Sequence, residues 1–150
     1  MSQVSTVVDN IVTRLDALLT SAAGWNKLPF AYDITKNDEK YLKQGYAFAI
    51  GPGTNSKRLQ SSKVSQRREI TITLTRANDT LDSDEASKKT LEKTILENMR
   101  TVVADFEGNQ TLNSGEIPVE FSSDQGIQFV NDENEEFLMI QGTFFVEYFE

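Results

Sequence analysis

The last stretch of the chain, residues 137–149, alternates between two sets of side chains, and both sets are largely apolar. One set is Leu138, Ile140, Gly142, Phe144, Val146 and Tyr148, and the other includes Phe137, Met139, Phe145 and Phe149. Alternation with a period of two is typical of a β-strand. A strand that is apolar on both faces lies inside a sheet or is covered by a partner. The stretch therefore predicts a sheet in which it has a central or covered place.

Two segments show the three- and four-residue spacing of amphipathic helices. The first is residues 4–19, where the apolar positions are Val4, Val7, Val8, Ile11, Val12, Leu15, Leu18 and Leu19. The second is predicted over residues 84–106, before Gly108, with a capping box from Asp82 to Glu85. Its apolar stripe is Leu91, Ile95, Met99, Val102 and Phe106. Each pattern predicts a helix with one apolar face on a core.

Shorter segments with strand character occupy much of the remaining chain. Strands are predicted at residues 45–50, 65–76, 116–122 and 126–130. Gly51-Pro52-Gly53 is predicted to end the first, and turns are predicted at residues 37–40 and 131–135. Residues 25–44 are predicted to form a connection with a short edge strand, because Pro29 excludes a central one. The polar residues 54–64 are expected to form a long loop or a protruding hairpin arm.

Together these segments predict an α+β fold with a mostly antiparallel sheet. Two amphipathic helices pack on one face of that sheet, and a loop or hairpin arm protrudes from it. The length of 150 residues fits one domain over residues 1–150, and there is no internal repeat or linker.

The chain contains no histidine and no cysteine. Catalytic triads that need either residue, disulfides and thiolate metal sites are therefore excluded. We expect a protein that is not an enzyme and that holds no cofactor or metal. The sequence begins without a basic segment followed by an apolar run, and it has no apolar stretch long enough to span a bilayer. We therefore expect a soluble protein made in the cytoplasm.

Charge is distributed unevenly along the chain. Residues 1–100 hold all 15 Lys and Arg with 12 acids, a net charge of +3, whereas residues 101–150 hold 11 acids and no base, a net charge of −11. This asymmetry predicts a dipolar surface suited to head-to-tail packing, or acids that merely keep the domain soluble, and the two alternatives stay open.

The strongest candidate site is a cluster of five bases around the predicted arm: Lys57, Arg58, Lys63, Arg67 and Arg68. Such a cluster binds an acidic protein surface, faces solvent, or contacts nucleic-acid phosphates. A protein contact is favoured, and nucleic acid is the weakest of the three, because no aromatic residues are interleaved for base stacking.

Other motifs carry less chemistry. Gly51-Pro52-Gly53 follows a strand as phosphate loops do, but no Gly-Lys-Ser/Thr follows it, so a turn is favoured. The acids Asp132, Glu133, Glu135 and Glu136 lack the glycine and terminal glutamate of a calcium loop, so a charged hairpin tip is favoured. The pairs Glu116 with Glu120 and Asp105 with Glu107 are too ordinary in an acidic chain to indicate a glycosidase.

The order of elements resembles the tail-terminator, or tail-completion, proteins of long-tailed phages of the lambda type. The resemblance covers nearly the whole chain. It rests on an N-terminal helix, a strand, a polar arm, the strand 67–74, a capped helix over 84–106, and the closing strand 137–148. It is a resemblance of layout, without a diagnostic motif.

The resemblance implies a virion protein of the tail or neck. Subunits of that family form a ring, usually hexameric, with the sheet around the lumen and the helices outside. The ring caps the tail tube, ends its polymerisation and offers a surface to the head-closure or neck protein, while genomic DNA passes without sequence-specific recognition. It implies no catalytic residue, and it makes the arm the candidate contact to the tail tube protein or a neighbouring subunit. Two alternatives stay open: a head-closure or adaptor protein of the neck, and a small nucleic-acid-binding module.

Overall fold

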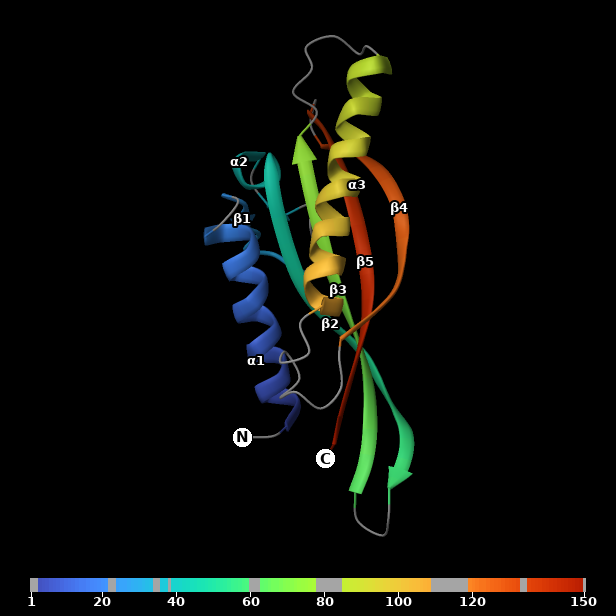
Figure 1. Ribbon diagram of the computed structural model, residues 1–150. Helices are drawn as coiled ribbons and strands as arrows, with labels where there is room; N and C mark the ends of the chain where they lie inside the picture. Colours follow the sequence, from blue (N-terminus) through green and yellow to red (C-terminus); the bar gives the residue numbers. More distant parts are fainter. Residues whose placement is uncertain are drawn as a thin grey trace.

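A computed structural model describes residues 3–21, 24–33, 36–37, 39–59, 63–77, 85–108, 119–132 and 135–149. Within them, the helices are α1 (Gln3–Asp16), the π-helical turn η1 (Ala17–Ser21), α2 (Glu39–Leu42) and α3 (Glu85–Gly108). The strands are β1 (Asn26–Lys27), β2 (Gln44–Leu59), β3 (Lys63–Ala77), β4 (Glu120–Asp132) and β5 (Glu135–Phe149). The two long helices run in opposite directions along the sheet (Figure 1). The predicted α+β class is confirmed.

The five strands form one sheet with the order β1-β2-β3-β5-β4. β1 pairs with β2 in parallel, and every other pairing is antiparallel. The register aligns Ile70 of β3 with Ile50 of β2 and with Phe144 of β5. β5 lies between β3 and β4, which confirms the interior place predicted from its two apolar faces.

Both long helices cover the same face of the sheet. Their buried side chains join those of the strands in a single core cluster: Val7, Ile11 and Leu15 of α1, continued by Leu19 of η1, with Ile95, Met99, Val102, Val103 and Phe106 of α3. On the strand side the cluster contains Tyr46, Ile70, Ile72, Leu74, Leu138, Ile140, Phe144 and Val146. These strand residues occur at every second position, because successive side chains of a strand point to opposite faces. The predicted arrangement of two helices on one face is therefore present.

The opposite face of the sheet carries a smaller apolar cluster at one end. Leu28 and α2 residue Leu42 pack there against Ala47 and Phe137. Farther along the same face the side chains are neutral and polar: Thr71, Thr73, Gln141 and Thr143. Gln141 Nε2 donates a hydrogen bond to Thr73 Oγ1 over 3.3 Å. This face therefore has an apolar end and a neutral, polar middle.

The β2–β3 hairpin extends beyond the rest of the sheet (Figure 1). The last pair of β3 with β5 is Ser65 with Phe149, whereas β2 and β3 continue to pair as far as Leu59 with Lys63. We call residues 54–64 the arm. Of the two predicted forms, loop or hairpin, the hairpin is the one observed.

Gly51-Pro52-Gly53 does not end the strand, contrary to the sequence prediction. β2 passes through this tripeptide with a register shift between Ile50 and Gly53. A bulge leaves its extra residues outside the ladder, so the missing N–H of Pro52 costs no ladder hydrogen bond there. The strand therefore bends and continues into the arm.

The predicted strands at 116–122 and 126–130 are likewise replaced by a single strand, β4, with residues 116–118 outside the described part. Gly126 adopts a φ of 74°, and its N–H donates to Asp124 Oδ1 over 2.8 Å. This irregularity shifts the register between Asp124 and Ile127 without ending the pairing with β5. At the other end, β4 and β5 close on the pair Asp132 and Glu135, as a hairpin tip requires.

Two smaller differences concern the helices. The turn predicted at residues 37–40 leads instead into α2, which begins at Glu39. α3 includes Gly108, where a stop just before that residue was predicted. The capping residue Asp82 lies outside the described residues.

Candidate functional site

The five bases of the candidate site fall into two groups along the hairpin. The first group is Lys57, Arg58 and Lys63, which lie in the arm, where the backbone pairs are Lys57 with Ser65, Arg58 with Val64 and Lys63 with Leu59. Only the backbone of these three is described. Arg67 and Arg68 lie at the root of the arm, where β3 also pairs with β5.

Arg67 is held against the helix-free face of the sheet. Its guanidinium carbon lies 3.9 Å from the centroid of the Phe145 ring, and Nη2 lies 3.5 Å from Glu120 Oε2. The contact links β3 to β4 across β5. Because the side chains of Arg67 and Glu120 are 38% and 70% exposed, the ion pair itself adds about 0–1 kcal/mol to stability. The Nε atom of Arg67 is buried and has no hydrogen-bond partner among the described residues.

Arg68 fills the bulge of β2. Its Nη1 donates a hydrogen bond to the carbonyl oxygen of Gly51 over 3.0 Å. A Cβ added at Gly53 would lie 2.6 Å from Arg68 Nη2, so the glycine leaves the space that the guanidinium occupies. Arg68 therefore fixes the direction in which the arm leaves the sheet. The sequence groups Arg68 with the arm charges and carries no local signal for this contact, which depends on the register between β2 and β3.

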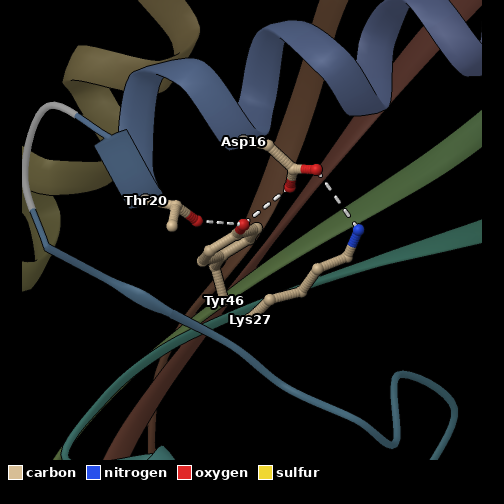
Figure 2. Close-up of polar contacts among 4 residues, drawn as sticks. All are labelled: Asp16, Thr20, Lys27 and Tyr46. Carbon is tan, nitrogen blue, oxygen red and sulfur yellow. Dashed lines mark hydrogen bonds and ion pairs between the residues drawn. The ribbon is translucent and has the colours of Figure 1, made fainter.

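A second polar group joins the end of the first helix to the sheet (Figure 2). The Tyr46 hydroxyl donates to Asp16 Oδ1 over 2.6 Å. Its single proton is thereby used, so the Thr20 hydroxyl, 2.5 Å away, donates to it. Lys27 Nζ lies 3.4 Å from Asp16 Oδ2. The four residues connect α1, η1, β1 and β2.

The pKa of Tyr46 is raised to about 12, mainly by burial and secondly by the hydrogen bond to Asp16. A phenol with that pKa stays protonated at neutral pH and does not serve there as a base or nucleophile. Tyr46 is therefore a structural donor that connects the helix layer to the sheet.

Two arginines hold other elements together. Arg14 of α1 donates through Nε to Asp105 Oδ2 of α3 over 2.8 Å and through Nη2 to Oδ1, a two-bond pair that raises the pKa of Arg14. Arg76 Nε donates to Asn98 Oδ1 over 3.0 Å, and its guanidinium lies 5.0 Å from the Trp25 ring. Burial lowers the pKa of Arg76. These contacts fasten the helices to each other and to the sheet.

The carboxylates considered from the sequence are distributed rather than gathered. Asp105 is paired with Arg14, and Glu120 with Arg67. Glu116 and the side chains of the acidic tip lie outside the described part. Among the residues that are described, no three acids come together as ligands for a metal ion.

The chain matches no protein-family model, and no curated protein matches it in sequence. Across the described ranges, no helix combines the length and the apolar character needed to cross a membrane.

Proposed function

We propose that this protein is a structural subunit of a long-tailed phage virion, without enzymatic activity. In this proposal several copies form a ring, with six as the expected number. The ring caps the tail tube, ends its polymerisation, and presents a surface to the head-closure or neck protein. It acts in the assembled tail and neck after synthesis in the host cytoplasm.

The observation that carries the proposal is the arm on its bulged root. The β2–β3 hairpin continues beyond the last pairing of β3 with β5, and three bases lie along it. Arg68 fixes the root by its bond to Gly51, so the arm leaves in a defined direction. A directed, basic extension is suited to docking on a neighbouring ring or subunit, where opposite charges steer association.

The helix-free face supports the same proposal. Its middle carries Thr71, Gln141 and Thr143, which have no charge, and Thr73 beside them is buried. This uncharged part of the face does not hold phosphates strongly, so DNA is free to slide along it. With this face toward the lumen and α1 and α3 outside, a ring would let the genome pass without sequence-specific binding.

The direct test is the length of tails made by a phage that lacks this gene. We expect tubes of abnormal length, because nothing stops their polymerisation, and normal length on supplying the protein in trans. Electron microscopy of negatively stained tails measures the distribution. Tails of normal length that fail to join heads would reject the terminator role and favour a head-closure or adaptor protein.

A further inference from the structure

Among the described residues, the sheet has two lateral edges at which much of the outer strand pairs with no further strand. On one side, β1 pairs with β2 only at Gly45 and Tyr46, and the N–H of Ile50 is bonded to the Tyr32 hydroxyl. On the other side, β4 ends the strand order, and no described strand pairs with its outer edge. Open edges expose backbone groups that pair readily with another chain.

The two edge strands carry opposite charge. β2 contains the bases Lys57 and Arg58 and no acid, whereas β4 contains the acids Glu120, Asp124 and Asp132 and no base. Pairing an edge with its own kind, as a two-fold dimer does, brings like charges together. Pairing unlike edges places a strand that holds bases beside a strand that holds acids, which favours a head-to-tail contact.

Exposed apolar side chains lie at both edges. Tyr32, which is 77% exposed, and Ile50, which is 43% exposed, lie at the β2 edge. Phe129, which is 45% exposed, lies on β4 near α3, with Lys88 Nζ 5.9 Å from its ring centroid. Each edge therefore offers apolar area to a partner in addition to charge.

The strand directions allow the two edges to meet in an ordinary sheet arrangement. From β2 through β3 and β5 to β4 the direction reverses three times, so β4 runs opposite to β2. Rotation about an axis along the strands keeps these directions. The β4 edge of one copy then lies antiparallel to the β2 edge of the next, which continues the sheet from subunit to subunit.

We propose that the β2 edge of each subunit binds the β4 edge of a second copy, and that repetition of this contact closes the ring. The interface combines the Tyr32 and Ile50 edge with the Phe129 edge and is oriented by the opposite charges of the two strands. The inference rests on the proposed ring-forming function and assigns that ring its subunit contact.

Single-cysteine variants test this contact, since the natural chain has no cysteine. Ala49 and Ser123 occupy one row of the sheet, through Thr71 and Thr143. Strand tilt can shift which β4 residue lies opposite Ala49 of the next copy, so three partner positions are used. An Ala49→Cys variant is mixed in turn with a Ser123→Cys, a Gln125→Cys and a Gln128→Cys variant. A short bis-maleimide should then give covalent dimers in at least one mixture and none with Ala49→Cys alone. A Thr101→Cys variant, on the exposed side of α3, is the control partner.

The outcomes separate the contact from other modes of assembly. The edge contact would be overturned if none of the three mixtures gave dimers. It would also be overturned if dimers were equally abundant with the Thr101→Cys partner or with Ala49→Cys alone. The cross-linking is done with purified protein and with assembled phage particles, so that a ring formed only on the tube is also sampled.

A charge test gives an independent measurement by light scattering. Ser122 and Ser123 are exposed on β4. Changing both to Lys should weaken association about tenfold, whereas changing both to Glu should not weaken it. Equal association of the two variants contradicts the contact. If the protein forms an oligomer but gives no cross-links between the two edges, only this inference is rejected. If a phage that lacks the gene makes tails of normal length, the proposed ring function itself is rejected.

Discussion

At the scale of single residues, Tyr46 shows how one hydroxyl ties two layers together. Its ring is buried in the core, and its oxygen exchanges hydrogen bonds with Asp16 and Thr20 at the end of the first helix. Tyr46→Phe keeps the ring but leaves both partners without this oxygen. We expect a loss of about 1–3 kcal/mol in the free energy of unfolding at pH 7, measured by urea denaturation.

The same hydroxyl gives the stability a pH dependence. The pKa of Tyr46 is raised to about 12 in the folded state from an ordinary value of 10.0. A raised pKa means that the contribution is complete below about pH 10 and is lost as the pH rises toward 12. The wild type should therefore lose stability over this window more steeply than Tyr46→Phe. Parallel curves for the two proteins would show that the hydroxyl is not held as described. Thr101→Val, at an exposed helical site, is the control.

At the scale of elements, the close approach of α2 and β1 to β2 depends on Gly45. A Cβ there would lie 2.5 Å from the Tyr41 carbonyl oxygen and 2.6 Å from Leu28 Cδ2. Gly45→Ala should cost about 2–3 kcal/mol, because a backbone atom must move. Gly142→Ala is the matched control, since its nearest neighbour is the flexible Met99 at 3.0 Å. Thermal unfolding compares the two, and an equal loss would refute the dependence.

The elements that the sequence predicted best are those with a long apolar period. Residues 4–19 and 84–106 were predicted as helices because one face repeats every three or four positions, and both lie on the core. Glycine and proline misled the prediction at Gly51-Pro52-Gly53, and the break predicted before Gly126 is only an irregularity within β4. These residues favour a turn locally, but long neighbouring strands keep pairing on either side, so each site becomes a bulge.

The candidate site was predictable only in part, for the same reason. The basic composition of the arm is visible in the sequence, and so is its polar character. The contacts of Arg67 with Phe145 and of Arg68 with Gly51 depend on strand register over distances of many residues. A local pattern carries no information about that register. The sequence therefore could not show that Arg67 and Arg68 have a different structural role from the bases of the arm.

At the scale of the whole molecule, the charge asymmetry becomes spatial. The edge strand β2 and the arm hold bases, and the opposite edge strand β4 holds acids. The asymmetry along the chain is therefore also an asymmetry across the sheet. The two lateral edges of such a sheet differ from each other, and a closed ring of identical copies requires two different contact surfaces on each subunit.

In the proposed function the arm supplies a third contact, and its three bases can be neutralised by substitution. We expect Lys57→Gln, Arg58→Gln and Lys63→Gln together to weaken binding to tail tubes by about tenfold or more, because the pairing of opposite charges is lost. Rising salt should weaken the wild type and leave the variant little changed. Co-sedimentation with purified tubes measures both effects.

The matched control removes three bases elsewhere: Lys89→Gln, Lys93→Gln and Arg100→Gln, all exposed on α3. This variant has the same net charge as the arm variant, so a general electrostatic effect would weaken both equally. A contact through the arm weakens only the first, and unchanged thermal unfolding of both shows that the fold is intact. Equal tube binding by the two variants would therefore show that the arm is not part of the interface with the tube. The edge-to-edge contact of the ring is tested separately, by cross-linking.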